Sequence, residues 1–209
     1  MSGPETTRFD LIETIAFDPE QGMPLLDHHL ARLKQSAAEL GFEFDRHSAR
    51  NELQAATFRL RQKSRVRMLL SRGGALAIEV REHRTWPAPV MKVATVKRQV
   101  GANDWRLAHK TTDRGIYRDA LAAGGTFEVV LLDEEDFPTE GCFSNIFVER
   151  GDRLVTPPLK RGLLPGVLRA SLIALGEAVE GDVRLQDLHR GFFIGNAARG
   201  MVAAQLVAI

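Results

Sequence analysis

Two adjacent glycines, Gly73 and Gly74, lie between two β-prone segments at residues 65–70 and 75–81. A glycine pair in that position is typical of a two-residue hairpin, so it predicts two antiparallel strands. The helical and strand-like segments of this half of the chain do not alternate as a parallel sheet would require. We therefore expect an α+β fold.

The rest of the first half supplies one strand before this hairpin, two helices, and one strand after it. Asp27 is expected to cap the first helix, whose apolar residues recur at helical spacing, and the helix should stop near Gly41. The expected ranges are 9–17 for the first strand, 27–40 and 48–61 for the helices, and 91–96 for the last strand.

The second half mixes helices with short apolar runs. Gly124 and Gly125 end a predicted helix, and Pro165 is expected in the first turn of another, where proline is tolerated. We place a domain boundary near residue 97, which gives a small α+β domain at 1–97 and a larger domain at 98–209. The expected helices are 113–123 and 165–178, the expected strands are 127–132, 142–149, 154–155, 183, 192–194 and 201–207, and turns are expected at 137–141 and 185–189.

The charges of the chain nearly cancel, with 28 basic and 27 acidic residues and a net charge of +1. No overall positive field would therefore attract nucleic acid or a membrane surface. No segment approaches the ~20 apolar residues of a membrane helix, and residues 1–8 contain no apolar signal core. Cys142 is the one cysteine, so no internal disulfide is possible. We expect a folded cytoplasmic protein that binds neither nucleic acid nor membrane.

Several motifs that would define other functions are absent. The sequence has no Gly-x-x-x-x-Gly-Lys-Ser/Thr loop, no Gly-x-Gly-x-x-Gly fingerprint and no Gly-x-Ser-x-Gly elbow. This argues against nucleotide hydrolysis and serine-hydrolase chemistry. The six histidines never have the i, i+4 spacing that directs two imidazoles to one metal ion from a helix, so we expect no metal site.

The segment 162–169 resembles an anion-binding turn that leads into a helix. The first backbone N–H groups of that helix, those of Gly166, Val167 and Leu168, lack partners within the helix. These groups and the helix dipole favour a phosphate. Most helix N-termini bind nothing, so an ordinary capped helix is the alternative explanation.

Lys110 and Glu140 are the two further candidates for chemistry. Lys110 lies just before the predicted helix at 113–123. A neutral lysine amine can form a Schiff base when burial or nearby cations lower its pKa from about 10.4. Glu140 lies in the turn before the predicted strand at 142–149. Taken alone, each residue is more plausibly explained as an exposed surface charge.

In their order along the chain, these segments resemble the class IV, or fold-type IV, family of pyridoxal-phosphate-dependent aminotransferases and lyases. The resemblance covers nearly the whole chain, through residues 9–15, 29–37, 109–112, 139–147, 164–166 and 193–196. It implies a homodimer and a two-domain α+β fold, in which a small α/β domain accompanies a larger β-barrel-like domain with flanking helices. Family members generally have a further strand before the first matched segment, so the small domain is expected to be trimmed at its N-terminus.

The resemblance also implies a role for each matched residue. Lys110 would form the Schiff base with pyridoxal 5'-phosphate and later move a proton at the adjacent carbon. Glu140 would pair with the pyridine nitrogen and keep it protonated. Arg32 and Asn196 would flank the phosphate beside the helix N–H groups. A solvated helix face is the alternative for Arg32, and a purely structural turn is the alternative for Asn145. The predicted cofactor site is Arg32, Lys110, Glu140, Asn145, Leu164, Gly166, Val167, Leu168 and Asn196.

Within the family, Arg114 favours the branch of 4-amino-4-deoxychorismate lyases, whose members often have arginine four residues after the lysine. The loop at 195–200 is also closer to that branch. Such a lyase converts 4-amino-4-deoxychorismate to 4-aminobenzoate and pyruvate in folate biosynthesis. Its substrate has two carboxylates, so Arg114 and Arg199 are the candidate substrate-binding residues. Tyr117 could border the pocket or simply pack.

Two other functions stay open. A class IV aminotransferase acting on branched-chain or D-amino acids would need a keto-acid acceptor. A binding or scaffold protein that kept the fold would hold no cofactor, but the presence of both Lys110 and Glu140 argues against it by analogy.

Overall fold

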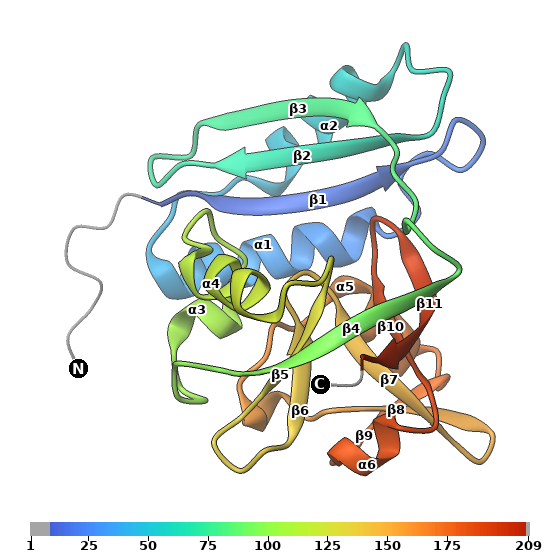
Figure 1. Ribbon diagram of the computed structural model, residues 1–209. Coiled ribbons are helices and arrows are strands. Elements are labelled where there is room, and N and C mark those ends of the chain that lie inside the picture. The colour runs from blue at the N-terminus through green and yellow to red at the C-terminus, as the bar shows by residue number, and fades with distance from the viewer. Residues whose placement is uncertain (1–8, 208–209) are drawn as a thin grey trace.

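The computed structural model describes residues 9–207, and its strands form two sheets (Figure 1). A three-stranded sheet has the order β1-β2-β3, and an eight-stranded sheet has the order β10-β11-β4-β5-β6-β7-β8-β9. Because helices accompany both sheets, the expected α+β class is confirmed. Residues 1–8 and 208–209 of the two predicted domains lie outside the described residues.

The small sheet is antiparallel, as the glycine pair predicts. Two helices connect its first strand to its second. The elements are β1 (Leu11–Phe17), α1 (Leu26–Leu40), α2 (Arg46–Thr57), β2 (Ser64–Leu70) and β3 (Leu76–Glu82). Gly74 has a φ of +83° in the turn between β2 and β3, a conformation that glycine adopts without steric cost.

The ends of the two helices agree with the prediction only in part. Gly41 ends α1 in the left-handed conformation, as expected. Asp27, however, lies inside the first turn of α1 and pairs with Arg46 of α2 at 2.6 Å, so it is not the cap. The helix α2 begins earlier than predicted, because the carboxylate of Asp45 accepts a hydrogen bond from Ser48 N at 2.6 Å.

The small core lies between β1 and α1. Leu11 and Ile15 of β1 pack in one cluster with Leu30 and Leu33 of α1. Side chains alternate along a strand, so Glu13 lies on the same face of β1 as these apolar residues. A carboxylate is therefore buried at the helix-facing side of the sheet.

Six strands of the larger sheet close into a barrel, because β10 pairs with β7 as well as with β11. The strand β4 is parallel to both of its neighbours, β11 and β5. The closure confirms the predicted β-barrel-like architecture. The six strands are β4 (Val90–Lys97), β5 (Val129–Leu132), β6 (Pro138–Gly141), β7 (Asn145–Arg150), β10 (Phe192–Asn196) and β11 (Gly200–Leu206).

The remaining elements flank this barrel. Two strands extend the sheet beyond β7, namely β8 (Arg153–Thr156) and β9 (Ala178–Glu180). The helices are α3 (Trp105–Ala108), α4 (Gly115–Gly124), the 3-10 helix η1 (Leu159–Arg161), α5 (Val167–Ala174) and α6 (Leu185–Leu188). Among residues 9–207, no helix has both the length and the apolar character needed to cross a bilayer.

Several local expectations are wrong. Residues 138–141 form the strand β6 rather than a turn, because β5 and β7 pair with them on both sides. The helix α5 begins at Val167, so Pro165 precedes the helix instead of lying in its first turn. Ala178 begins the strand β9 rather than ending that helix, Val183 belongs to no strand, and α6 replaces a predicted turn.

The chain passes from the small sheet to the barrel before residue 90. The strand β4 at residues 90–97 belongs to the barrel, although it falls within the predicted domain 1–97. The passage between the two sheets is the segment 83–89. Whether residues 1–97 and 98–209 fold separately stays a prediction.

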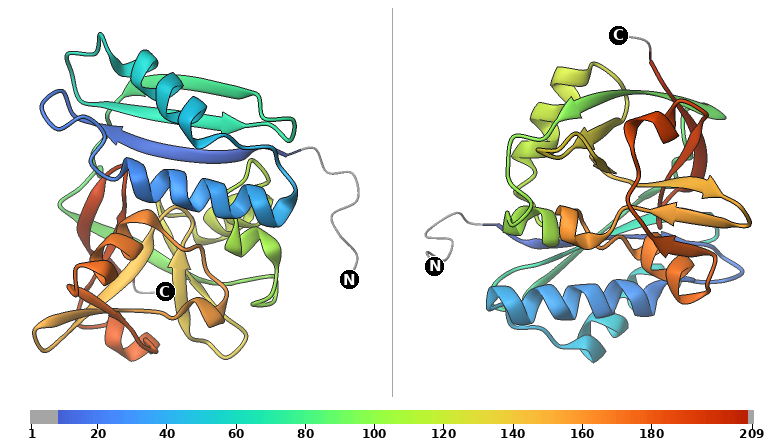
Figure 2. Two further views of the ribbon diagram at one scale, coloured as in Figure 1. Left: turned by 180° about the vertical axis from the view of Figure 1, so that it is seen from behind. Right: turned by 90° about the horizontal axis from the view of Figure 1, so that it is seen from below.

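Backbone hydrogen bonds tie the segment around Lys110 to the small sheet. Ile12 N donates to Lys110 O at 2.9 Å, and Thr112 N donates to Asp10 O at 2.9 Å. Lys110 therefore lies where the two sheets meet. Figure 2 shows α1 lying along the small sheet on the side of the barrel, where it contacts α5.

Candidate active site

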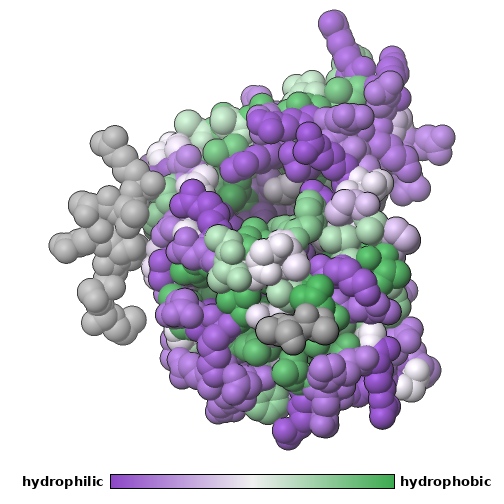
Figure 3. All heavy atoms as spheres, in the orientation of Figure 1, coloured by the Kyte–Doolittle hydropathy of each residue, from purple (hydrophilic) through white to green (hydrophobic). Residues whose placement is uncertain are grey.

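A cavity of about 420 Å³ lies between the small sheet and the barrel. Figure 3 shows the surface hollowed beneath the largely hydrophilic upper layer. The sequence-predicted residues that line it are Arg32, Lys110, Arg114, Glu140, Asn145, Leu164, Gly166, Val167, Asn196 and Arg199. Leu168 is not among the lining residues, since its side chain packs in the cluster of Phe147 and Leu172.

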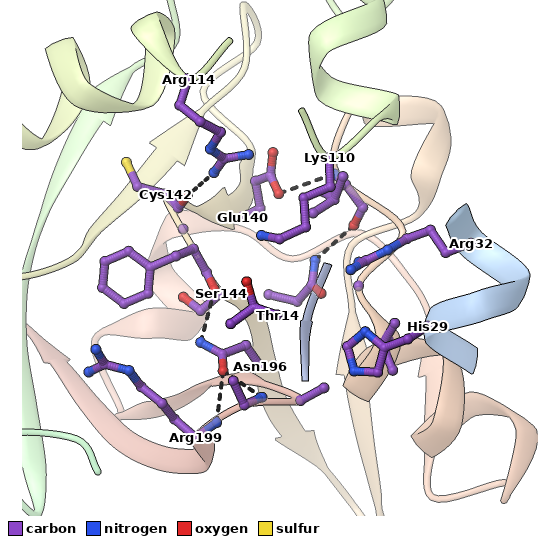
Figure 4. Close-up of a pocket in the computed structure, with 18 of the residues that line it drawn as sticks. Thr14, His29, Arg32, Lys110, Arg114, Glu140, Cys142, Ser144, Asn196 and Arg199 are labelled. Carbon is purple, nitrogen blue, oxygen red and sulfur yellow. Dashed lines mark hydrogen bonds between the residues drawn. The ribbon is translucent and has the colours of Figure 1, made fainter. Parts of the chain in front are cut away.

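The amine of Lys110 points into this cavity (Figure 4). Burial and the positive charges of Arg114 and Arg32 lower the pKa of Lys110 to about 7, although the carboxylates of Glu13 and Glu140 favour the charged amine. At neutral pH a substantial share of the amine is therefore uncharged, which is the nucleophilic form.

Both carboxyl oxygens of Glu140 accept hydrogen bonds from the protein. The hydroxyl of Tyr117 donates to Oε1 at 2.9 Å, and Leu164 N donates to Oε2 at 3.1 Å. Burial raises the pKa of Glu140 to about 7, because the hydrogen bonds and the charge of Arg114 offset only part of the burial effect. A cationic N–H group beside Glu140 would return it to the ionised form.

Arg114 lies on the Glu140 side of the cavity. Its guanidinium is stacked 3.7 Å above the ring of Tyr117 and donates to the carbonyl of Cys142. Its Nη1 is buried and has no hydrogen-bond partner within residues 9–207. Tyr117 is buried behind Glu140 and does not line the cavity. Of the two roles that the sequence left open, Tyr117 therefore packs and does not border the pocket.

Arg32 is paired with a carboxylate that sequence reasoning missed. Its Nε donates to Glu13 Oε1 at 2.9 Å, its Nη2 donates to Glu13 Oε2 at 2.6 Å, and its Nη1 donates to Pro165 O at 3.2 Å. Burial disfavours the ionised form of Glu13, but the charges and hydrogen bonds of Arg32 and His29 lower its pKa to about 2. Arg32 thereby joins β1 to the turn before α5.

His29 completes this group and was also missed as a site residue. Its Nδ1 is 2.6 Å from Glu13 Oε2, and its Nε2 is buried without a partner in the described part of the chain. Burial lowers the pKa of His29 despite the adjacent carboxylate. The spacing of residues in the sequence could have indicated this group. Residues 29 and 32 lie on one face of a helix, and position 13 falls on the apolar face of a strand.

The turn before α5 presents backbone N–H groups to the cavity. Gly166 is the N-cap of α5, and no side chain caps this helix. Asn145 Nδ2 donates to Leu164 O at 3.1 Å, and Asn145 Oδ1 lies where a Cβ on residue 166 would have to be. Only glycine fits there, so Asn145 holds the turn in the shape that leaves the first N–H groups of α5 available.

The turn between β6 and β7, residues 141–144, is held by a buried acid. The carboxylate of Glu128 accepts hydrogen bonds from Cys142 N at 2.7 Å, Phe143 N at 3.0 Å and Ser144 Oγ at 2.8 Å. Burial raises the pKa of Glu128 to about 7, although these donors favour the carboxylate. The sequence showed this acid in an apolar run with no visible partner.

The carbonyl groups of the same turn are also bonded. Arg114 donates to the carbonyl of residue 142, and Asn196 Nδ2 donates to the carbonyl of residue 143 at 3.0 Å. Because Glu140 precedes this turn and Asn145 follows it, Glu128 positions both residues from behind.

Asn196 uses its other polar atom to shape the next loop. Its Oδ1 accepts hydrogen bonds from Ala198 N at 3.0 Å and Arg199 N at 2.9 Å. The loop so formed brings the side chain of Arg199 to the cavity. Asn196 thus supports the cavity wall through two backbone segments.

The comparisons with known proteins agree with this fold and site. The family model for amino-transferase class IV matches residues 10–207. The chain therefore belongs to the class IV aminotransferase family, as the resemblance in its sequence predicts.

Individual relatives add detail. The chain is 29% identical over 180 residues to a Schizosaccharomyces pombe protein named "Putative aminodeoxychorismate lyase", covering 83% of this chain and 77% of that protein. The structure is similar, with a TM-score of 0.88 and 35% identity, to that of a "Putative amino-acid aminotransferase" from Mesorhizobium loti, over 95% of this chain and 100% of that chain. The PLP-bound form of a hypothetical aminotransferase from Mycobacterium tuberculosis shares the fold, with a TM-score of 0.81 and 20% identity over 94% and 81% of the two chains.

The residues of the cavity fit pyridoxal phosphate. The uncapped N-terminus of α5 and the adjacent Arg32 suit its phosphate, and Glu140 suits its ring nitrogen. His29 Nε2 and Arg114 Nη1 are buried atoms without partners in the described residues. Buried polar atoms are normally bonded, so these two indicate that the cavity is built for a polar ligand.

Proposed function

We propose that this protein is a pyridoxal-phosphate-dependent lyase that converts 4-amino-4-deoxychorismate to 4-aminobenzoate and pyruvate, a step of folate biosynthesis. The observation that carries the cofactor assignment is the meeting of Lys110 and Glu140 in one cavity beside the uncapped N-terminus of α5. The lyase assignment is supported by the likeness to the Schizosaccharomyces pombe protein over most of both chains. Arg114, four residues after the lysine, supports it as well.

The roles of the residues follow from their surroundings. When bound, pyridoxal phosphate supplies an aldehyde that reacts with amines and a ring that withdraws electrons. The uncharged amine of Lys110 would hold this group and could then move a proton at the carbon next to the substrate nitrogen. Glu140 in its ionised form holds a proton on the ring nitrogen. The N–H groups of α5, together with Arg32, bind the phosphate.

A class IV aminotransferase acting on branched-chain or D-amino acids is the second candidate. It is favoured by the 35% identity to the Mesorhizobium loti protein, which is named an amino-acid aminotransferase. The two functions use the same cofactor site and differ in the fate of the substrate. A lyase releases pyruvate without an acceptor, whereas an aminotransferase needs a keto acid and leaves the cofactor in its amine form.

The test is a pyruvate assay in the absence of any keto acid. Purified protein loaded with pyridoxal phosphate is incubated with 4-amino-4-deoxychorismate, and pyruvate is measured by coupling to lactate dehydrogenase. We expect equal amounts of pyruvate and 4-aminobenzoate and an unchanged aldehyde-form absorbance. Loss of that absorbance with branched-chain or D-amino acids, and no pyruvate, would support the aminotransferase instead.

Two lysine variants control this assay. Lys110→Ala should abolish both the visible absorbance of bound cofactor and the release of pyruvate. Lys160→Ala, which changes an exposed lysine on η1, should alter neither. A wild-type protein that binds no cofactor at all would support the binding or scaffold alternative.

The homodimer and the cytoplasmic location belong to the same proposal. The dimer rests on the resemblance to the family, and sedimentation equilibrium at micromolar concentration should give twice the chain mass. A reducing compartment suits Cys142, which is free and buried.

A further inference from the structure

Arg199 lies across the cavity from Arg32 (Figure 4), and its guanidinium lies near three aromatic rings. The centre of its guanidinium is 5.2 Å from the ring of Phe127, 5.4 Å from that of Trp86 and 5.6 Å from that of Phe143. Contacts between a cation and ring faces hold a guanidinium in place without neutralising its charge. Arg199 is therefore fixed but still cationic.

No carboxylate pairs with Arg199 within residues 9–207. Its side chain makes a single hydrogen bond, from Nη1 to the carbonyl of Thr85 at a long 3.4 Å. Glu128 is the acid whose charge acts on it, but the oxygens of Glu128 are occupied by the turn at 141–144. The guanidinium thus has unused donors at the cavity wall.

Two further arginines add positive charge at the same place. Arg65 of β2 lines the cavity, and the charges of Arg65 and Arg84 act on Arg199. Neither side chain forms an ion pair or a hydrogen bond in the part of the chain that the structure describes. Like charges that converge at a partly buried site repel one another, and an anion bound there would relieve that repulsion.

The rings beside these cations form an apolar wall. Trp86 and Phe143 are stacked with their centroids 5.9 Å apart, and Phe127 meets Phe143 edge-on at 5.5 Å. Phe127 and Phe143 line the cavity. A wall of this kind favours a planar ring by stacking and by burial of apolar surface.

We propose that Arg199, Arg65 and this aromatic wall form a subsite for a carboxylate attached to a planar ring. The subsite lies across the cavity from the residues that suit the phosphate, so it selects amines whose carboxylate is remote from the reacting nitrogen. The orientation of the substrate rests on the proposed function, whereas the binding of a ring carboxylate does not require turnover. Arg114 belongs to the Glu140 side and does not contribute.

Three small molecules distinguish the contribution of the carboxylate charge to binding from the contribution of the ring. Cofactor-loaded protein is titrated by calorimetry with benzoate, which has both features, with benzamide, which lacks the charge, and with acetate, which lacks the ring. Benzoate should bind about tenfold or more tightly than benzamide, because hydrogen bonds to a charged partner are stronger than neutral ones. It should also bind about tenfold or more tightly than acetate, because acetate has no ring to pack against the aromatic wall. Equal affinities for benzoate and benzamide would overturn the subsite.

Variants of single residues show which side chains bind the carboxylate and which bind the ring. Arg199→Gln should weaken benzoate binding about tenfold and leave benzamide binding unchanged, and Arg65→Gln should give a smaller loss of the same kind. Phe143→Leu should weaken benzoate and benzamide together. Arg153→Gln, which changes an exposed arginine on β8, should change nothing. The cofactor absorbance of each variant checks that it is folded, and unchanged benzoate binding by a folded Arg199→Gln would overturn the proposal.

Failure of the subsite and failure of the proposed function give different results. A protein that releases no pyruvate but prefers benzoate to benzamide has the subsite and uses another ring-bearing amine. A protein that releases pyruvate without that preference is a lyase that lacks the subsite.

Discussion

At the scale of single residues, burial brings the acid and the base of this site to the same pH range. Burial disfavours whichever form of a group is charged, so it lowers the pKa of Lys110 and raises the pKa of Glu140, each to about 7. A group whose pKa lies near the working pH can both accept and donate a proton. Neither residue differs in type from a surface charge, so this property comes from the fold alone.

The pKa of Lys110 predicts how cofactor uptake depends on pH. The rate of pyridoxal phosphate uptake, followed by stopped-flow absorbance, should rise with pH with a midpoint at about 7, because only the uncharged amine reacts. Arg114→Gln removes a charge that lowers this pKa, so the midpoint should move to higher pH. Arg118→Gln, an exposed control on α4, should leave it in place. An unmoved midpoint in Arg114→Gln would contradict the electrostatic explanation.

The pKa of Glu13 predicts a stability that is lost in acid. The pKa is about 2 in the folded protein and 4.5 ordinarily, so the stabilisation is fully present above pH 4.5 and is lost as the pH falls toward 2. The shift corresponds to about 3 kcal/mol. Glu13→Gln should therefore reduce the free energy of unfolding by about 3 kcal/mol at pH 7 in urea titrations, and the loss should shrink below pH 4.5.

A control separates this effect from a general loss of charge. Glu52→Gln, which changes an exposed residue of α2, should leave stability unchanged at both pH values. If the difference between wild type and Glu13→Gln does not vary with pH, the pair with Arg32 is not its source.

At the scale of elements, the turn between β6 and β7 connects the two ends of the cofactor site. It follows Glu140 directly and precedes Asn145, which holds the turn before α5. Short strands such as β6 contribute few hydrogen bonds of their own. The geometry therefore depends on side chains that bond the turn from outside, chiefly Glu128.

Glu128→Gln tests this dependence. The amide nitrogen of glutamine would face N–H donors, so at least one of them would lose its acceptor. We expect the free energy of unfolding to fall by about 1–3 kcal/mol and the affinity for pyridoxal phosphate to fall about tenfold, measured by thermal unfolding and absorbance titration. Glu149→Gln, exposed on β7, is the matched control. Reduced stability with unchanged cofactor affinity would show that Glu128 supports the fold alone.

At the scale of the whole molecule, local signals were readable from the sequence and long-range pairings were not. Gly41, Gly74 and Gly125 mark helix ends and a hairpin because their backbone conformations depend on near neighbours. The closing pair of β10 with β7 joins distant segments, and no local pattern encodes it. The order of the family motifs, rather than periodicity, predicted the barrel and predicted that Lys110 and Glu140 share one site.

The difference between local signals and long-range pairings also explains why the sequence did not reveal three residues of the site. Glu13, His29 and Glu128 are defined by partners that lie far away in the sequence or on another element. An isolated acid in a strand pattern gives no indication of the donor it will meet. The place of β4 in the barrel was hidden for a related reason, since this strand is joined to β5 and β11 by parallel pairing across long connections.

The position of β4 predicts how the chain can be divided. This strand lies between β11 and β5 in the barrel, and Val93 in it is fully buried. A fragment of residues 98–209 lacks the strand and would expose two unpaired edges, so it should show no cooperative thermal transition by near-UV circular dichroism. A fragment of residues 84–209 retains β4 and should unfold cooperatively, at a lower temperature than the whole chain because one wall of the cavity is missing. A cooperative transition in the shorter fragment would show that the barrel does not need β4, and would support the boundary at residue 97.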